Sequence, residues 1–380
     1  MLPLLVQLAC SGPPTPAPTL APAGPPPNLV LVVWESTRAD HTTVGGYPLR
    51  TTPTLSRLAQ SGVVFEQQLS AAPWTHPSVS SLLTGLSPVA HGVRVYEDVL
   101  GDPVETLAER LKARGYATAF VGSNTFFEGP NNLAQGFDSW FGVGDVSGPE
   151  LLVKVDDFLD ARPADQPFFL YLHLFEPHCP YDPPAEFAGG FVQAPGEASD
   201  RRYPAEYWEQ MFGCVRLPVP GREGPPVLEL AAYLAAYDAE LRTADMLTGQ
   251  LLEELDQRRL LQDSLLVVTA DHGEAFYEHG DHGHGRQLYQ ESVRVPLVVS
   301  PPWPHRPLSA RGARSPWSAP TSPNCPVIPA SPPARATAMA ASTSPANDTQ
   351  DSGGPHEHLA RLPQLHPSGP QLPRSRRAHL

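Results

Sequence analysis

Four polar side chains in this sequence, Glu35, Thr75, Asp271 and His272, could together carry out metal-assisted chemistry on an ester. Two carboxylates, a hydroxyl and an imidazole form a ligand set that suits Zn²⁺ or Mn²⁺, and Ca²⁺ less readily. Coordination lowers the pKa of a hydroxyl, which would make Thr75 a nucleophile. The cation would also neutralise the charge that develops on a transferring phosphoryl or sulfuryl group.

Thr75 stands where an extended, proline-marked stretch runs into a segment typical of a short helix. A helix N-terminus presents unpaired N–H groups and partial positive charge, which suits an anionic ester. The alternative is that Thr75 only caps the helix, with Pro77 in its first turn. We favour the nucleophile because the other polar clusters also follow predicted strands.

Two histidines are further site candidates. His178 follows a proline at the end of a predicted strand, and we expect it to contact substrate or metal; the alternative is a turn residue that bonds backbone. His284 lies in the run 278–286, where glycines between histidines permit tight turns. We expect His284 to be functional and most other histidines of this run to be solvated.

Three continuous apolar runs predict strands that are buried on both faces: Asn28–Trp34, Phe168–Leu174 and Ser264–Ala270. Each run ends before a cluster of acids and histidines. Open α/β sheets place their ligand sites at the carboxyl ends of parallel strands. These clusters are therefore expected to meet at one edge of the sheet.

Amphipathic segments and shorter apolar runs separate these three strands. The expected helices cover residues 54–62, 104–115, 150–159 and 228–260, and the further strands cover 63–65, 116–121 and 293–299. This alternation predicts an α/β fold with a doubly wound, mainly parallel sheet flanked by helices. Residues 185–225 show no pattern and are expected to form an irregular insertion on the substrate side.

The two ends of the chain differ from the body in composition. Residues 1–10 resemble the end of a bacterial lipoprotein signal with Cys10 as the lipidated residue, which implies an exported periplasmic or cell-envelope lipoprotein with a membrane tether. Residues 11–27 predict a Pro-rich linker. The predicted catalytic domain covers 28–300, and 301–380 predict a Pro/Ser/Arg-rich disordered tail.

The charge of the chain limits its partners. The formal net charge is −14, and because the tail carries +5 the first 300 residues carry −19. So acidic a body argues against nucleic-acid binding and favours cations near its surface. The sequence contains no CxxC pair, so a cysteine-based zinc site is not expected. An exported chain could pair Cys179 with Cys214. No protein partner is inferred.

A series of short motifs resembles the sulfatase-like branch of the alkaline phosphatase superfamily, in register over roughly residues 28–299. The motifs are Arg38-Ala39-Asp40-His41, Pro73–Gly85, His91-Gly92-Val93, Gly136-Phe137-Asp138, His173 with Glu176-Pro177-His178, Tyr237-Asp238-Ala239-Glu240, Asp271-His272-Gly273, Gly283-His284-Gly285 and Arg294–Leu297. The resemblance implies an alkaline phosphatase-like fold acting on a small anionic ester.

Within that resemblance, Glu35 falls at a metal-ligand carboxylate that is usually Asp, and Asp271 with His272 at a second ligand pair. Thr75 falls at the nucleophile, and His178 and His284 at positions that contact substrate or metal. True sulfatases carry Cys or Ser within Cys/Ser-x-Pro-x-Arg and oxidise it to formylglycine. Here Thr replaces that residue and Val79 replaces the Arg. The set is more similar to phosphoethanolamine transferases and other Thr-nucleophile phosphoesterases.

After Ser300 the resemblance ends, and the family's smaller C-terminal subdomain is missing or replaced. A shifted reading frame and a natural disordered tail are the two explanations. The sequence thus predicts a metal-dependent sulfatase-like hydrolase that acts on phosphoric or sulfuric esters through a Thr nucleophile. The alternatives are a phosphoryl or phosphoethanolamine-type transferase and an inactive, lipid-tethered remnant.

Overall fold

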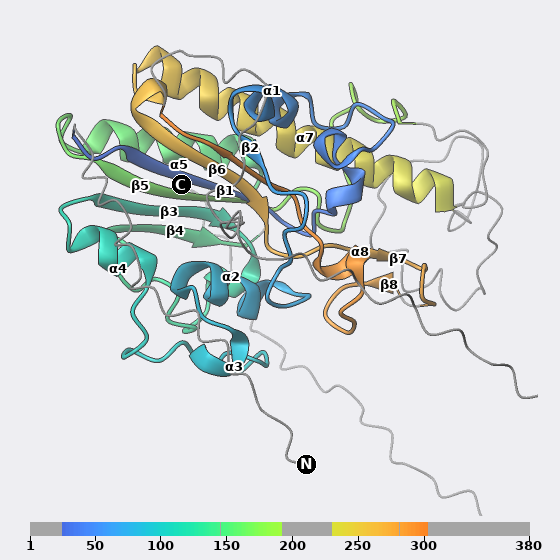
Figure 1. The fold of residues 1–380 in the computed structure, drawn as a ribbon, viewed down its shortest axis with the longest axis horizontal. Helices are drawn as coiled ribbons and strands as arrows, with labels where there is room; N and C mark the ends of the chain where they lie inside the picture. Colours follow the sequence, from blue (N-terminus) through green and yellow to red (C-terminus); the bar gives the residue numbers. More distant parts are fainter. Residues whose placement is uncertain (1–24, 145, 192–229, 281, 303–380) are drawn as a thin grey trace, which may run out of the picture. The chain divides into compact units, whose positions relative to one another are not determined.

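Seven strands of the described chain form the central sheet, in the order β2-β9-β6-β1-β5-β3-β4 (Figure 1). The computed structural model describes residues 25–144, 146–191, 230–280 and 282–302. From one edge to the other the strands are β2 (Val63–Val64), β9 (Leu297–Ser300), β6 (Ser264–Ala270), β1 (Asn28–Trp34), β5 (Phe168–Leu174), β3 (Ala117–Ser123) and β4 (Ser139–Val143). The pairs from β6 to β4 are parallel, whereas β9 and β2 join as antiparallel strands.

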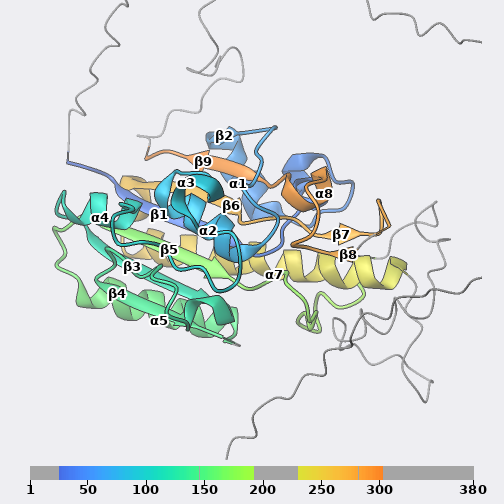
Figure 2. The ribbon, with the colours of Figure 1, turned by 90° about the horizontal axis from the view of Figure 1, so that it is seen from below.

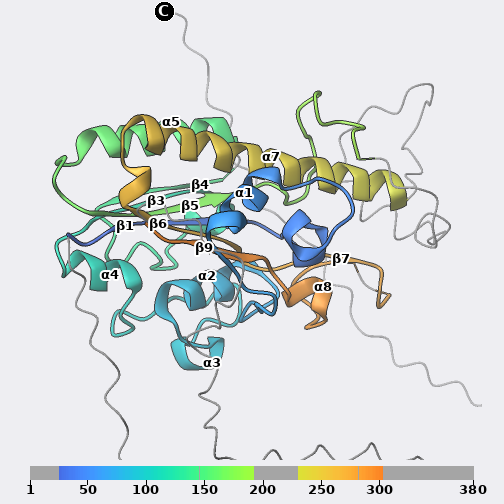
Figure 3. The ribbon, with the colours of Figure 1, turned by 45° about the horizontal axis from the view of Figure 1, so that its top comes forward.

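Helices cover both faces of this sheet (Figure 3). On one face lie α1 (Pro53–Ser61), α5 (Gly148–Ala161) and α7 (Leu230–Gln257), and on the other lie α2 (Thr75–Thr84), α3 (Pro88–His91) and α4 (Leu107–Lys112). β1 shows why both faces need cover. Val30 and Trp34 pack into the core beneath α5 and α7, while Val33 packs into the core beneath α2 and α4.

The remaining elements are short. β7 (Ala275–Phe276) and β8 (His282–Gly283) form a two-stranded sheet, and α8 (Gln290–Val293) lies next to it, beyond the carboxyl end of β6 (Figure 2). In the described part of the chain, 3-10 turns cover Ala39–His41, Thr43–Gly45, Thr125–Phe127 and Leu261–Asp263. None of the helices in the described ranges is long and apolar enough to cross a bilayer.

The predicted α/β class with a mainly parallel, doubly wound sheet is confirmed. The strands expected at 28–34, 168–174 and 264–270 have the predicted bounds. The helix expected at 104–115 begins only at Leu107, because Thr106 and Glu109 form a capping box there. The insertion expected at 185–225 lies mostly outside the described residues, as do the signal, most of the linker and the tail.

The strand expected at 293–299 is partly wrong. Residues 290–293 form α8, and β9 begins after Pro296, which has no N–H to give to a ladder. β9 then runs antiparallel to β6, with Thr269 opposite Leu297. β4 was not expected, because Ser139–Val143 is short and contains a glycine.

Candidate active site

Glu35 and Asp271 lie side by side because their strands are neighbours. Trp34 ends β1 opposite Ala270, the last residue of β6, so the two acids are the next residues of adjacent parallel strands. Both side chains are fully buried. The expected meeting of acid clusters at the carboxyl edge of the sheet is therefore what the structure shows.

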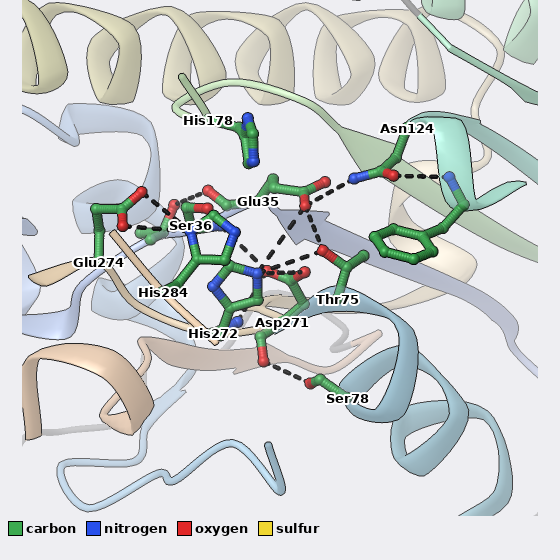
Figure 4. A network of polar contacts seen from close by, with 12 residues as sticks. Glu35, Ser36, Thr75, Ser78, Asn124, His178, Asp271, His272, Glu274 and His284 are labelled. Carbon is green, nitrogen blue, oxygen red and sulfur yellow. Dashed lines mark hydrogen bonds and ion pairs between the residues drawn. The ribbon is translucent and has the colours of Figure 1, made fainter. Parts of the chain in front are cut away.

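Thr75 is the first residue of α2 and points toward these acids (Figure 4). Its hydroxyl Oγ1 donates to Glu35 Oε1 at 2.6 Å and lies 3.4 Å from His272 Nε2. The N-cap residue of α2 is Trp74, and no side chain caps the helix. The reading of Thr75 as a mere capping residue is therefore wrong.

Two residues that sequence reasoning gave no role hold Glu35 in place. Asn124, directly after β3, donates from Nδ2 to Glu35 Oε1 at 2.8 Å. His173, next to last in β5, places Nε2 2.8 Å from Glu35 Oε2. The available signal was their position, because each is a polar residue at the end of a buried apolar strand, as Glu35 is.

The two buried carboxyls have opposite pKa shifts. Burial opposes ionisation of Glu35, but the hydrogen bond and charge of His173 outweigh it and hold the pKa of this carboxyl well below its ordinary value. Burial, and then the negative charge of Glu35, raise the pKa of Asp271 above its ordinary value. A cation between the two would let both ionise.

Asp271 has one oxygen without a partner. Its Oδ1 accepts hydrogen bonds from the backbone N–H groups of Ser36 and His272 at 3.1 and 2.8 Å, whereas the buried Oδ2 has none. An unpaired buried carboxylate oxygen is costly. The backbone carbonyl of Asp271 accepts hydrogen bonds from Ser70 and Ser78, which joins this strand end to α2.

His272 completes the donor set. Its Nδ1 lies 2.8 Å from the carbonyl oxygen of Gly273, to which it can donate, and this leaves the lone pair on Nε2. Nε2 is 3.3 Å from Asp271 Oδ2 and 3.9 Å from Glu35 Oε1. Burial lowers the pKa of His272 strongly, which keeps the ring neutral, as a metal ligand must be.

These donors fit a divalent cation. Glu35 Oε1, Asp271 Oδ2, His272 Nε2 and Thr75 Oγ1 converge, and Oδ2 is the orphan that an ion would satisfy. Atoms of Glu35, His173 and Asp271 also lie within 4.8 Å of one another. We assign His173 to positioning Glu35, because its Nε2 is already bonded to Oε2.

His178 and His284 line the same cavity as Thr75, of about 690 Å³. The ring of His284 lies 4.4 Å from that of His272 and 5.2 Å from that of His178. His284 Nδ1 is 3.2 Å from both carboxylate oxygens of Glu274. Burial opposes protonation, but Glu274 raises the pKa of His284 to about 9.

The structure thus brings all six predicted residues together. Glu35, Thr75, Asp271 and His272 form the donor set, the ring of His284 lies against that of His272, and His178 lies beside His284 (Figure 4). His178 also bonds the backbone carbonyl of Cys179, so part of the turn alternative holds as well. Glu274, which orients His284, was not singled out from the sequence.

Comparison with known proteins gives a consistent result. Residues 27–309 match the model of the family described as Sulfatase. An ulvan-active sulfatase of Formosa agariphila is 25% identical over 307 residues, covering 73% of this chain and 56% of its own length. An N-acetylgalactosamine-6-sulfatase of Canis lupus familiaris is 34% identical over 317 residues, covering 74% and 58%.

Two solved structures share the fold. A phosphonate monoester hydrolase of Agrobacterium radiobacter has a TM-score of 0.60 at 20% identity, covering 73% of this chain and 68% of its own. The C-terminal periplasmic domain of a phosphoethanolamine transferase of Campylobacter jejuni has a TM-score of 0.51 at 20% identity, covering 72% and 78%. The chain spans a little over half the length of the two sulfatases above.

Proposed function

This chain belongs to the sulfatase family of the alkaline phosphatase superfamily, and from that premise we propose that it hydrolyses sulfate or phosphate esters with Thr75 as its nucleophile. The observation that carries the proposal is the contact set of Thr75 Oγ1, which is 2.6 Å from Glu35 Oε1 and 3.4 Å from His272 Nε2. A hydroxyl held among buried metal-type ligands at a helix N-terminus is suited to attack an anionic ester.

Glu35, Asp271, His272 and Thr75 would hold a divalent cation, with Zn²⁺ or Mn²⁺ favoured over Ca²⁺ by the mixed nitrogen and oxygen donors. Such an ion, when bound, lowers the pKa of the Thr75 hydroxyl and neutralises charge on the transferred group. Asn124 and His173 keep Glu35 in the orientation that this role needs.

In the proposed reaction Thr75 Oγ1, after losing its proton to solvent, bonds to phosphorus or sulfur while the bond to the alcohol oxygen breaks. His284 is our choice for giving a proton to the departing oxygen, because Glu274 orients its ring and it lines the cavity with Thr75. Water then attacks the ester on Thr75, its proton passes to His284, and the bond from phosphorus or sulfur to Oγ1 breaks, which restores both residues. His178, in the wall of the same cavity, is proposed to contact the transferred group.

Thr75 also separates this chain from formylglycine chemistry. A threonine side chain cannot be oxidised to that aldehyde, so the family's usual nucleophile is not available at this position. The similarity to proteins named as sulfatases supports the proposal of an ester hydrolase. Because this chain covers only a little over half of their length, the choice of substrate is also part of the proposal.

The test uses the full chain, loaded in turn with Zn²⁺, Mn²⁺ and Ca²⁺ and assayed on aryl phosphate, phosphodiester and sulfate esters. We expect turnover with at least one ester and, after an acid quench, a Thr75 peptide heavier by one phosphoryl or sulfuryl group. Turnover without that adduct under single-turnover conditions would contradict the nucleophile. Absence of turnover with every metal would instead favour the inactive remnant.

We further propose that the chain works outside the cytoplasm. Cys179 is disulfide-bonded, which fits an oxidising compartment. Cys214, with which an exported chain could pair it, lies outside the described residues. The predicted lipid tether at Cys10 leads to a fractionation experiment in a bacterial host. Wild type should sediment with membranes and Cys10→Ala should not; equal partition of the two would refute the tether.

A further inference from the structure

A second cavity, of about 470 Å³, opens beside the one that holds Thr75. The two cavities share Phe175, His178 and Pro180 as a common wall. The second one is acidic, because Glu150, Glu176, Asp182 and Glu240 all line it. Among the described residues that line it, none is lysine or arginine.

Glu240 lies on α7 and is buried, with 5% of its surface exposed. Its Oε1 accepts a hydrogen bond from the backbone N–H of Asp182 at 2.6 Å. Burial, and then the charges of Glu176 and Asp182, raise the pKa of Glu240 to about 8. The carboxyl therefore lacks the positive neighbour that would favour its ionised form.

Glu176, the second residue after β5 and two before His178, also lacks a positively charged neighbour among the described residues. Its Oε1 accepts a long hydrogen bond of 3.3 Å from the backbone N–H of Gly148, and its buried Oε2 has no partner. Burial raises the pKa of this carboxyl as well. A buried, unpartnered carboxylate oxygen in the wall of a cavity points to a positively charged ligand.

The spacing of these acids argues for an organic cation rather than a metal ion. In the described ranges, the one set of three acid or histidine ligand atoms within 4.8 Å of one another is that of Glu35, His173 and Asp271. No three acids of the second cavity therefore lie close enough together to form such a ligand set. Phe175, Met246 and Leu247 add apolar and aromatic wall, which suits an alkylammonium group.

The charge of the whole chain supports the same choice. An anionic ester approaching a protein of net charge −14 is repelled at long range. A zwitterionic ester, with an ammonium group balancing its phosphate or sulfate, escapes that repulsion. The adjoining cavities offer one place for each charge.

We infer that the cavity of Glu176 and Glu240 binds the ammonium group of a substrate whose phosphate or sulfate ester lies at Thr75. This inference deepens the proposed function, since it names the substrate class as aminoalkyl esters. His178 lines both cavities, so the two proposed binding sites adjoin at this residue, and the test below compares alkyl linkers of two lengths.

The kinetic test compares esters that differ only in the cation. The pairs are 2-aminoethyl against n-propyl and 4-aminobutyl against n-pentyl, each as phosphate and as sulfate. For at least one pair, wild type should favour the ammonium ester in kcat/KM by about 10-fold or more, and the double variant Glu176→Gln, Glu240→Gln should bring that ratio to within about twofold of one. Glu253→Gln, an exposed acid on α7, is the matched control and should keep the wild-type ratio.

A binding test separates this inference from the proposed function. Butylammonium and the neutral 1-butanol are titrated by calorimetry into Thr75→Ala, and into the same variant that also carries the two Gln substitutions. Binding of the cation to Thr75→Ala, and its loss in the triple variant, would support the ammonium site even if no ester turned over. A ratio near one in wild type, or equal binding of the two probes, would overturn it.

The Gln variants are expected to fold. Burial raises the pKa of both carboxyls. At a pH above the pKa of an ordinary glutamate, their ionisation therefore lowers the stability of the folded state. Replacing them with the isosteric amide removes that cost. Thermal melts at pH 8 should therefore show the double variant at or above the melting temperature of wild type.

Discussion

Replacing Thr75 with alanine is expected to lower kcat/KM for ester hydrolysis by at least about 10³-fold, which corresponds to about 4 kcal/mol of transition-state stabilisation. The reason is that Oγ1, which donates to Glu35 at 2.6 Å, is the atom that would form the covalent bond to the transferred group. Thr75→Ser keeps a hydroxyl at this position and should retain far more activity. Steady-state assays on the best ester from the screen measure both variants.

Thr84 provides the matched control, because it is the last residue of the same helix and its hydroxyl bonds only backbone groups, those of Ser80 and Leu86. Its hydroxyl donates to the backbone carbonyl of Ser80 at 2.7 Å. Thr84→Ala should leave kcat/KM within about twofold of wild type. Comparable rates in Thr75→Ala and Thr84→Ala, with metal content equal to wild type, would remove Thr75 from the mechanism.

The second large effect is expected at Glu35. Glu35→Gln keeps the size of the side chain but removes the charge that would hold the cation, so both metal content and turnover should fall by about 10³-fold or more. The charge of Glu35 also raises the pKa of Asp271, so the variant should bring the pKa of Asp271 closer to its ordinary value. Elemental analysis of dialysed protein measures the first effect directly.

A chelator gives this prediction a second readout that does not depend on activity. With free metal about 1,000-fold above its Kd, bound metal stabilises the folded wild type by about 4 kcal/mol, and EDTA should remove that stabilisation. Melts of Glu35→Gln should not respond to EDTA. Glu105→Gln, which removes an acid from an exposed pair with Arg110, should respond as wild type does. An EDTA response of Glu35→Gln as large as wild type's would exclude Glu35 as a ligand.

The sheet could be predicted from sequence where burial alone decides. Asn28–Trp34 and Ser264–Ala270 are mostly apolar and rich in β-branched residues, and they lie between covered faces, which is the pattern of a strand buried on both faces. β9 was harder, because its start depends on Pro296 and its direction depends on the path of α8, which is a tertiary effect. A pattern of apolar residues predicts neither the start nor the direction of β9.

The site shows the same division. Glu35 and Asp271 could be placed together because each directly follows a buried strand, and these two strands are parallel neighbours in the sheet. Asn124 and His173 act by orienting another side chain, and nothing in a single sequence states which polar residue will bond Glu35. Positioning residues follow from the packing of strand ends in three dimensions, which spacing along the chain does not record.

The link between α2 and the end of β6 has a further consequence. Ser78, one turn after Thr75, and Ser70 both donate to the carbonyl of Asp271, and their hydroxyl oxygens lie 2.9 Å apart. Hydrogen bonds therefore tie the helix that carries Thr75 to the end of the strand that leads to Asp271. Because the ligands are already held in place, less conformational entropy is lost when a cation binds. A substitution at Ser78 that removes its hydrogen bond to Asp271 should therefore change the orientation of Thr75, although Ser78 itself does not contact the substrate.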